Sequence, residues 1–377
     1  MRKCRTAFIC PSKSWGGLEM NVFRLAGWLK ERGRPMLFYG YPGTELYRNF
    51  QKAGFDVKKL RSTSKFGDAL LSVPLSRMLR ADRADIAVVH LNKNLLLGAL
   101  AKKFSRRSLK LVYMQHMHVG GKKRDPFHRW LHRQIDAWVT PLEMFKDTLL
   151  EKTGLEPSRI AVIPLGVELD RFVKRPDKPA ARNKLGIPQD VPLAGVIGRL
   201  DPKKGQHILI EACRRLHDSG TPLHVLIVGD QSRGEQTGYG DRLHHLTGRL
   251  GLTDYVYFRP HTDDIETVFA ALDIFALTSQ SETYGMVTIE AMASGLPVIA
   301  TSEGGTPGIV AHEQNGLLIE PGSVAQLVEA LKRLIHDKPL SQTLAAQAQE
   351  DARTRFSHRR QCDLLEKLFD DLTGRSA

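Results

Sequence analysis

The sequence predicts an α/β protein made of two doubly wound domains, each built around its own parallel sheet. The chain has 377 residues, which is too long for one ordinary domain and suits two, each large enough to bury a core. Short apolar runs alternate with glycine turns and helix-length segments through both halves, a pattern typical of parallel sheets. We expect an N-terminal domain over residues 1–172, completed by a C-terminal helix over 357–377, and a C-terminal domain over 173–356.

The N-terminal half begins with the pattern of a strand, a turn and a helix. Residues 6–10 form an apolar run, Gly16-Gly17 follows as a turn, and residues 18–32 carry apolar side chains at helical spacing. Further strands are expected over 35–39, 86–90 and 109–114. Because helix-length segments separate these runs, we expect their sheet to be parallel.

The C-terminal half repeats the plan. Its expected strands cover 193–197, 223–228, 255–258, 274–277 and 297–300, each followed by a helical stretch or a turn. Ligands of open parallel sheets bind beyond the carboxyl ends of the strands. We therefore expect the two sheets to face each other across a cleft that holds the substrate.

The composition is typical of a soluble cytoplasmic protein. The four cysteines are scattered, without the spacing of a zinc site or of a disulfide framework. The first apolar run, residues 6–10, is too short for a signal peptide, and no stretch approaches the roughly 18 apolar residues of a membrane span.

The charge is unevenly divided between the halves. Residues 1–172 carry 32 Lys and Arg against 15 Asp and Glu, a balance of +17, whereas residues 173–377 carry 23 against 26, a balance of −3. Such segregation indicates an anionic partner for the first half, which phosphate-bearing lipid, a membrane surface or nucleic acid could provide.

Residues 281–298, with the sequence SETYGMVTIEAMASGLPV, have the pattern of a binding loop followed by a helix. The helix is expected to start near Gly285 and to stop at Gly295. The N–H groups and positive dipole at the start of a helix suit phosphate or sugar oxygens. Glu282 lies just before this helix and Glu290 within it, so both side chains can line one site.

A second loop, Gly198-Arg-Leu-Asp-Pro-Lys-Lys-Gly205, follows an expected strand and precedes an expected helix. Its cations Arg199 and Lys204 can grip a diphosphate and stabilise it as a leaving group. An Asp-x-Asp pair at a strand end would indicate a bound divalent ion, and the expected strands do not end in such a pair. We therefore expect chemistry that breaks a bond to a diphosphate without a metal.

Together these motifs resemble those of glycosyltransferase family 4, the retaining enzymes of the two-domain GT-B fold. The similarity includes the pair Glu282 and Glu290, the loop 198–205, and the segment 163–172, IPLGVELDRF, so that it spans both halves. It implies two Rossmann-like domains with parallel sheets facing across a cleft. Because this likeness is closest to enzymes of bacterial cell-surface glycans, it also implies an acceptor of that kind.

The resemblance assigns the donor site to the C-terminal domain. Arg199 and Lys204 would bind the donor diphosphate and act as catalytic residues by stabilising the leaving group. Glu290 would bind the ribose hydroxyls, and Glu282 would act at the donor sugar as a further catalytic residue. Backbone amides of four successive residues would bind the sugar and the distal phosphate, namely Tyr284, Gly285, Met286 and Val287.

In the N-terminal domain the resemblance implies two further parts of the site. Gly16 and Gly17 look like the family's loop that approaches the donor diphosphate. The family's active-site histidine, a catalytic residue, matches His116 best. His118, two residues later, is the alternative, and the sequence leaves this choice open.

The implied function is a retaining hexosyl transfer from a nucleotide diphosphate sugar to a hydroxyl of a cell-surface glycan or glycolipid precursor, such as lipopolysaccharide core. The resemblance implies no cofactor and no metal. Two enzymatic alternatives are a GT-B epimerase and a phosphorylase, and a third is a basic nucleic-acid-binding protein, although no motif for nucleic acid is recognisable. The sugar, the acceptor, the linkage and the oligomeric state stay open.

Part of the positive charge lies shortly after His116. The cations of this run and an aromatic neighbour are expected to border the acceptor or an anionic membrane at its cytoplasmic face. These residues are Lys122, Lys123, Arg124, Arg129 and Trp130. The alternative is that they form an ordinary solvated helix face.

Overall fold

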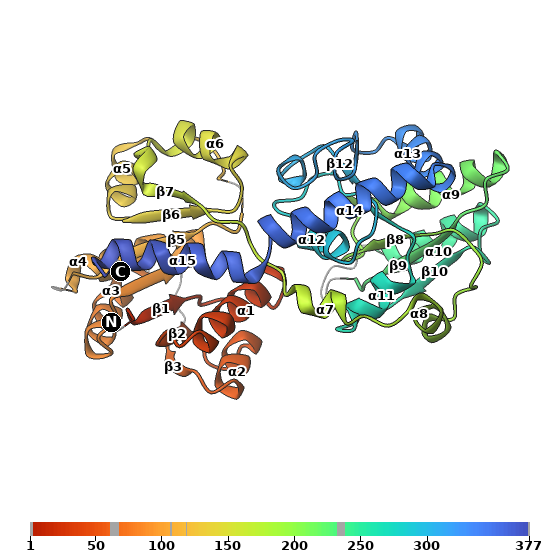
Figure 1. Ribbon diagram of the computed structural model, residues 1–377. Coiled ribbons are helices and arrows are strands. Elements are labelled where there is room, and N and C mark those ends of the chain that lie inside the picture. The colour runs from red at the N-terminus through yellow and green to blue at the C-terminus, as the bar shows by residue number, and fades with distance from the viewer. Residues whose placement is uncertain (1–2, 61–67, 106–107, 118, 232–237, 376–377) are drawn as a thin grey trace. The chain divides into compact units, whose positions relative to one another are not determined.

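The computed structural model divides the chain into two compact units (Figure 1). It describes residues 3–60, 68–105, 108–117, 119–231 and 238–375. Unit 1 comprises Met1–Gly166 and His358–Ala377, and unit 2 comprises Val167–Ser357.

The first break between the units falls after Gly166, earlier than the residue 172 that we expected from the sequence. Side chains just after the break are bonded within unit 2. Arg171 Nε lies 2.5 Å from Glu266 Oε1, and the ring of Phe172 packs against that of Phe269 with centroids 5.9 Å apart. These contacts explain why the segment belongs to the second unit.

Unit 1 contains a seven-stranded sheet in its described residues, with the order β3-β2-β1-β4-β5-β6-β7 and every pairing parallel. Its strands are β1 (Thr6–Ile9), β2 (Met36–Gly40), β3 (Asp56–Lys59), β4 (Ile86–Val89), β5 (Lys110–Met114), β6 (Ala137–Thr140) and β7 (Ile160–Val162). Its helices are α1 (Gly17–Glu31), α2 (Glu45–Lys52), α3 (Asp68–Ala81), α4 (Leu95–Phe104), α5 (Pro126–Arg133), α6 (Met144–Thr153) and α15 (His358–Thr373), with short 3-10 helices η1 (Asn92–Asn94) and η2 (Pro157–Arg159).

The two faces of this sheet carry separate cores. Side chains alternate along a strand, so Phe8 packs with residues of α1, α2 and α15, whereas Ile9 packs with residues of α3, α4, α5 and α6. The unit is therefore a sheet between two layers of helices.

Unit 2 contains a six-stranded sheet in its described residues, with the order β10-β9-β8-β11-β12-β13 and every pairing parallel. Its strands are β8 (Leu193–Ile197), β9 (His224–Val228), β10 (Val256–Arg259), β11 (Ile274–Leu277), β12 (Val298–Thr301) and β13 (Leu317–Ile319). Its helices are α7 (Leu169–Val173), α8 (Lys178–Leu185), α9 (Gln206–Asp218), α10 (Tyr239–Arg249), α11 (Ile265–Ala271), α12 (Met286–Ala293), α13 (Val324–His336) and α14 (Lys338–Arg355), with η3 (Pro202–Lys204) and η4 (Thr306–Gly308).

Both sheets reverse their strand order at one point. In unit 1 the chain runs outward from β1 to β3 and then returns to place β4 on the other side of β1; in unit 2 it does the same around β8 and β11. This is the doubly wound order of Rossmann-like domains, whose ligands bind at the carboxyl ends of the two strands that flank the reversal. The order thus marks one candidate site region in each unit.

The parallel sheets predicted for both halves are confirmed, but the sequence analysis missed the strands β3, β6, β7 and β13. β3 reads Asp-Val-Lys-Lys and lies at an exposed sheet edge, so no apolar run marks it. β7 and β13 are three residues long, too short for a periodic signal.

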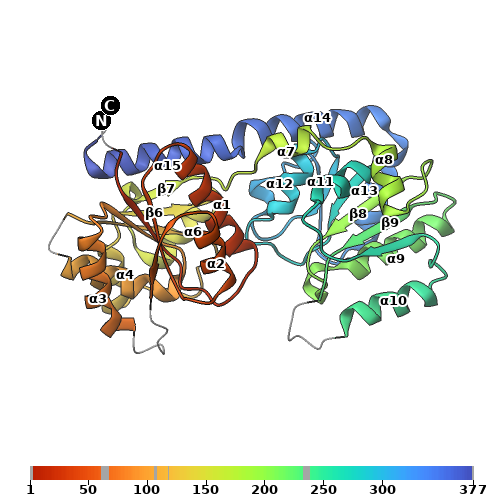
Figure 2. The same cartoon turned by 90° about the horizontal axis from the view of Figure 1, so that it is seen from below.

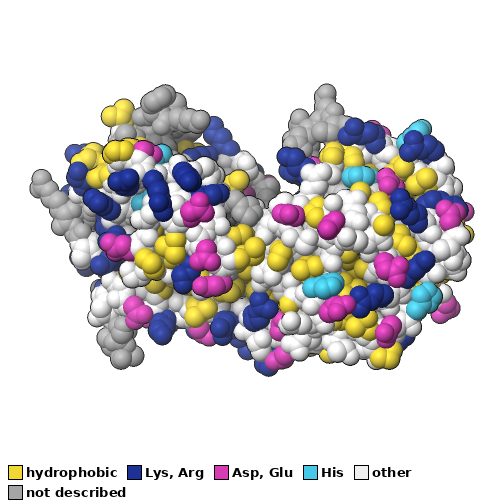
Figure 3. All heavy atoms as spheres, turned by 90° about the horizontal axis from the view of Figure 1, so that it is seen from above, with side chains coloured by type: hydrophobic (Ala, Val, Ile, Leu, Met, Phe, Trp, Pro, Cys, Tyr) yellow, Lys and Arg dark blue, Asp and Glu magenta, His cyan; other side chains and the backbone are white. Residues whose placement is uncertain are grey.

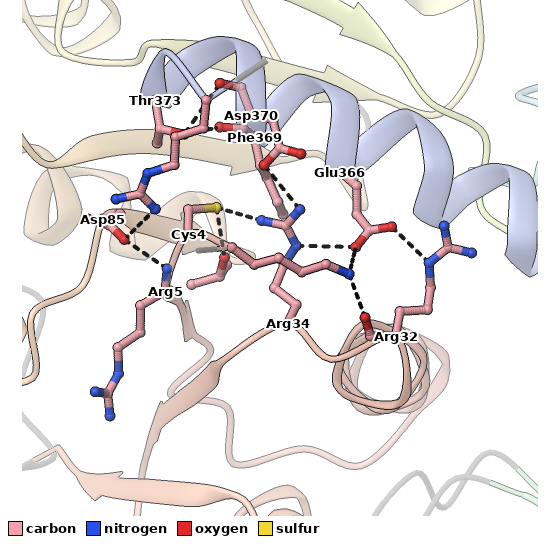
Figure 4. A network of polar contacts seen from close by, with 12 residues as sticks. Cys4, Arg5, Arg32, Arg34, Asp85, Glu366, Phe369, Asp370 and Thr373 are labelled. Carbon is pink, nitrogen blue, oxygen red and sulfur yellow. Dashed lines mark hydrogen bonds and ion pairs between the residues drawn. The ribbon is translucent and has the colours of Figure 1, made fainter. Parts of the chain in front are cut away.

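The C-terminal helix α15 is held to unit 1 by apolar packing and by a polar network (Figure 4). Cys362, Leu365 and Phe369 are buried in its core. Arg34, only 2% exposed, lies 3.2 Å from Asp370 and 3.6 Å from Glu366.

The two ends of the chain lie near each other in this unit (Figure 2). Lys3 Nζ lies 3.4 Å from Glu366, and Arg375 Nη1 lies 3.0 Å from Asp85. Because Arg34 is buried and compensated by carboxylates on α15, removal of those carboxylates would leave an unpaired buried charge. The expected completion of the N-terminal domain by a C-terminal helix therefore has a physical basis.

Candidate active site

The reversal point of unit 2 brings two loops together. One loop, residues 198–205, follows β8, and the other, residues 278–285, follows β11. Because β8 and β11 are neighbouring parallel strands, both loops leave the sheet at the same edge. The motifs singled out in the sequence lie in these loops and in α12.

The loop after β8 is anchored to the neighbouring turn after β9. Leu200 N–H donates to the Asp230 carbonyl, and a Cβ at Gly229 would lie only 2.1 Å from the Gly198 carbonyl oxygen. Arg199 Nη2 lies 2.8 Å from Asp201, and the Arg199 side chain is half exposed. A hydrogen bond from the Lys203 amide, together with Arg199, lowers the pKa of Asp201. Arg199 is thus held by an acid of its own loop.

The two loops are joined directly at Gly205. This residue has φ +68°, and a Cβ there would lie 2.2 Å from the Thr278 carbonyl oxygen, so a side chain is excluded by conformation and by space. Thr278 Oγ1 donates to the Lys204 carbonyl at 2.9 Å, and Gln280 N–H donates to the Lys203 carbonyl at 2.7 Å. The junction fixes the backbone on which Lys204 stands.

Lys204 and Glu282 form an ion pair across this junction. Lys204 Nζ lies 2.5 Å from Glu282 Oε1, which also accepts a hydrogen bond from Ser279 Oγ at 2.7 Å. The Glu282 side chain is 14% exposed and that of Lys204 is 30% exposed, so both are partly withdrawn from water. The structure therefore brings together two residues that the sequence assigned to one site.

Glu282 is also fixed through its backbone. Its carbonyl accepts a hydrogen bond from Gly305 N–H at 2.7 Å, and it forms an isolated parallel bridge with Gly304. Gly304 has φ +69°, and a Cβ there would lie 2.1 Å from the Glu282 carbonyl oxygen. This pair of glycines, Gly304 and Gly305, was not predicted from the sequence, although a Gly-Gly turn shortly after an expected strand is a usable signal.

Helix α12 starts at Met286 with Gly285 as its N-cap in the left-handed region. Tyr284 before it is buried, and Met286 and Val287 form its first turn. The free amides of this turn give the loop an electropositive end beside Glu282. Glu290 lies one turn further into the helix and is half-buried.

The reversal point of unit 1 carries the other expected residues. Gly16 is the N-cap of α1 and Gly17 its first residue, and Glu19 in the first turn is buried and accepts a hydrogen bond from Ser12 Oγ at 2.5 Å. His116 follows β5, one strand away from the reversal. The alternative histidine, His118, lies outside the described residues.

His116 has a partner that the sequence analysis missed. Its Nε2 lies 3.1 Å from Nδ1 of His90, which directly follows β4 and is buried. Burial lowers the pKa of His116 to about 4 and lowers that of His90 well below its usual range. Both rings are therefore neutral at physiological pH. The available signal was that both histidines lie at the ends of apolar strand runs, His90 directly after Val89 and His116 two residues after Met114.

The basic residues after His116 lie on and before α5. Lys122, Arg124 and Arg129 are exposed and Lys123 is partly so, and in Figure 3 Lys and Arg side chains gather over the end of unit 1 formed by α5 and α6. Trp130, however, is packed against the core, with Lys103 Nζ 5.7 Å from its ring centroid.

The aromatic side chain that α5 exposes is Phe127, at 50%. Trp130 is partly buried against this core, and its expected place at the border of a partner stays a prediction.

The described residues contain no group of three or more His, Cys, Asp or Glu side chains placed to hold a metal ion. In the same part of the chain, no helix combines the length and the apolarity needed to cross a bilayer.

The strand order defines the class of protein as an α/β protein with two doubly wound, Rossmann-like units. Family models narrow the class. Residues 15–171 match the model described as Glycosyltransferase Family 4, and residues 177–351 match that of glycosyl transferases group 1. The chain therefore belongs to the family 4 glycosyltransferases, and its fold is of the GT-B type.

Several curated relatives are D-inositol 3-phosphate glycosyltransferases. The protein from Stackebrandtia nassauensis is 32% identical over 279 residues, covering 71% of this chain and 62% of the relative. The protein from Nocardia farcinica is 37% identical over 195 residues, covering 50% of this chain and 43% of the relative. The chain thus spans about half of the length of the curated relatives it matches.

Solved structures resemble the whole chain. Anabaena HepE in complex with UDP is 25% identical with a TM-score of 0.85, covering 97% of this chain and 100% of that one. HepE with UDP-glucose is 26% identical with a TM-score of 0.77, covering 97% and 99%. A Rickettsia africae glycosyltransferase, 20% identical over the full length of both chains with a TM-score of 0.89, shares the fold.

Proposed function

We propose that this protein is a retaining, metal-independent glycosyltransferase that uses a nucleotide diphosphate sugar. The observation that carries the proposal is the junction of Lys204 and Glu282 at the reversal point of unit 2, beside the amides of α12. A cation, a carboxylate and a helix start within one edge of the sheet suit a diphosphate joined to a sugar. The likeness to HepE, solved with UDP and UDP-glucose, favours a uridine nucleotide.

In this proposal each residue of the site binds a different part of the donor. Lys204 exchanges part of its contact with Glu282 for the diphosphate, and Arg199 turns from Asp201 to the same group. The amides from Tyr284 to Val287 bind the distal phosphate and the sugar, with Glu282 at the sugar hydroxyls. Glu290 binds the ribose, and Gly16-Gly17 in unit 1 approaches the diphosphate.

The chemical step follows the front-side route. The bond between the sugar and the phosphate oxygen lengthens, the cation-like sugar bonds to the acceptor oxygen on the same face, and the departing phosphate oxygen takes the acceptor's proton. No side chain then forms a covalent intermediate. Two cations and a helix start stabilise the leaving group, which in preorganised sites contributes roughly 3 kcal/mol for each donor.

The proposed acceptor is a phosphate-bearing glycan or glycolipid precursor, such as lipopolysaccharide core, met at the cytoplasmic face of a membrane. The cations of unit 1 support an anionic acceptor or surface. The curated relatives are named D-inositol 3-phosphate glycosyltransferases, and this name implies an acceptor that also carries a phosphate.

A panel of nucleotide sugars tests this function. The protein is incubated with each donor and with phosphate-bearing acceptors, and ³¹P and ¹H NMR follow donor cleavage and the anomeric configuration of the product. We expect release of one nucleoside diphosphate and retention of configuration, both unchanged by EDTA. Interconversion of free nucleotide sugars would instead indicate an epimerase, and phosphate-dependent cleavage of a glycan a phosphorylase. Binding of nucleic acid with no turnover of any donor would remove the enzymatic reading.

A further inference from the structure

Two histidines at the carboxyl ends of neighbouring strands in unit 1 contact each other. His90 directly follows β4, His116 lies two residues after the end of β5, and the two strands pair in parallel. Nδ1 of His90 lies 3.1 Å from Nε2 of His116, which is hydrogen-bond distance. The His90 ring is 1% exposed and packs against Phe8 with centroids 4.6 Å apart, so it has little freedom to turn.

This contact fixes how a single proton can lie between the two rings. Burial keeps both imidazoles neutral by lowering the pKa of each, and His116 further lowers the pKa of His90. A hydrogen bond between two neutral imidazoles needs one nitrogen that carries hydrogen and one that offers a lone pair. Either His90 donates from Nδ1, or His116 donates from Nε2.

The second nitrogen of His90 distinguishes these arrangements. Its Nε2 is buried and has no hydrogen-bond partner among the described residues. If His116 were the donor, His90 would carry its own hydrogen on this Nε2, which would leave a buried N–H unpaired. If His90 is the donor, the same atom is only an unfilled acceptor. Orphaned buried donors are the rarer and costlier case.

We propose that His90 is a positioning residue that donates its Nδ1 hydrogen to His116 Nε2 and thereby holds His116 in the tautomer with hydrogen on Nδ1. His116 then presents a hydrogen-bond donor to any ligand and has no free lone pair. It can bind an oxygen of a sugar or a phosphate, but it cannot take a proton as a general base. The ligand named here rests on the proposed function; the tautomer does not.

The tautomer is tested without any substrate. The full chain is labelled with ¹⁵N in its 14 histidines, and long-range ¹H–¹⁵N correlation spectra at neutral pH separate the two neutral tautomers. His90 and His116 are assigned by single substitution. We expect both to carry hydrogen on Nδ1. Hydrogen on Nε2 of either ring would overturn the proposal, whatever the activity of the protein.

Two variants of His90 separate positioning from folding. His90→Asn keeps an N–H donor near the position of Nδ1, whereas His90→Phe keeps the ring and removes the donor. We expect His116 to keep its tautomer in His90→Asn and to become a mixture in His90→Phe. In His90→Phe a smaller fraction of the molecules would have His116 with hydrogen on Nδ1, which should raise the apparent KM for the donor sugar about threefold or more. In His90→Asn the KM should return toward that of the unchanged protein.

Circular dichroism and thermal melting establish that both variants are folded. An unchanged His116 tautomer in folded His90→Phe would contradict the positioning role. If the tautomer changes as expected but no nucleotide sugar is turned over, the proposed function fails and the role of His90 stands.

Discussion

The two units share a strand order and differ in what they place on it. By the structural boundaries, unit 1 carries 35 Lys and Arg against 17 Asp and Glu, a balance of +18, whereas unit 2 carries 20 against 24, a balance of −4. Since the same doubly wound sheet is built with either balance, the fold does not require the positive charge of unit 1. The difference therefore points to a partner of that unit.

The reversal points differ in the same way. In unit 2, glycines at 205 and 304 let two backbone segments approach until no side chain fits, and the ion pair of Lys204 and Glu282 stands on that junction. In unit 1, the corresponding region holds a buried Glu19 and the neutral pair His90 and His116. Unit 2 thus places an ion pair at its reversal point, whereas unit 1 places a contact between two neutral imidazoles near its own.

The largest expected effect tests the charged point of unit 2. Lys204→Ala should lower turnover about a hundredfold or more, because it removes a cation from the leaving group. Lys203→Ala is the matched control. The Lys203 side chain is next to Lys204 in the sequence and is exposed, so its removal should change turnover little. Steady-state kinetics with the preferred donor measure both. Equal rates for the two variants would remove the diphosphate role of Lys204.

The surface charge of unit 1 is tested by charge reversal on and before α5. Each Lys or Arg near an anionic membrane contributes on the order of 1 kcal/mol, so changing four to Glu should lower binding to anionic liposomes more than tenfold. The four are Lys122, Lys123, Arg124 and Arg129. Sedimentation with anionic and neutral vesicles at low and high salt measures it.

The control for that experiment reverses four cations of unit 2. They are Lys174, Arg249, Lys338 and Arg353, all exposed. The same change in net charge should leave most liposome binding in place if the basic surface of unit 1 acts locally. Equal loss in both sets would show that only net charge matters, and equal pelleting with neutral vesicles would remove the membrane proposal.

The junction of unit 2 is tested at its glycines. Gly205→Ala should destabilise by about 2 kcal/mol or more, because it adds a clash with the Thr278 carbonyl to the strain of a positive φ. Gly220→Ala is the control: it has φ +75° but nothing within 4 Å of the added Cβ. Urea unfolding gives both values. Equal losses in the free energy of unfolding would mean that only the strain of the positive φ matters. The clash with the Thr278 carbonyl would then be removed by a small shift of the backbone.

A further prediction concerns the acid stability of unit 1. The folded state lowers the pKa of His116 from 6.5 to about 4, so between these values the unfolded chain binds more protons than the folded one. This contribution to the free energy of unfolding is complete above pH 6.5 and is lost as pH falls toward 4. In His116→Gln the fall over this range should be shallower, as urea midpoints at several pH values would reveal. If the free energy of unfolding falls equally with pH in both proteins, the acid sensitivity belongs to groups other than His116.

Prediction from the sequence was most successful for strands and site residues that belong to a recognisable local pattern. The strands at the centre of each sheet are apolar runs that stand out between turns, as in β8 and β11, and both were predicted in place. β3 is polar and lies at a sheet edge, so no apolar run marks it, whereas β6 was missed although it is as long and as buried as β11. Glu282 and Lys204 were found because each lies in a long motif, whereas His90 stands alone at a strand end.

What the sequence by itself determined is the alternation of strands and helices, the two-domain plan, the segregation of charge and the residue types of the donor loops. What only the tertiary structure decided is which of these residues meet. Lys204 and Glu282 are 78 positions apart and His90 and His116 are 26 apart, yet each pair is in contact. Periodicity reports the face of a helix or strand but not its neighbours. Contacts of this kind follow from the order in which strands enter the sheet, and that order is selected by packing the whole core.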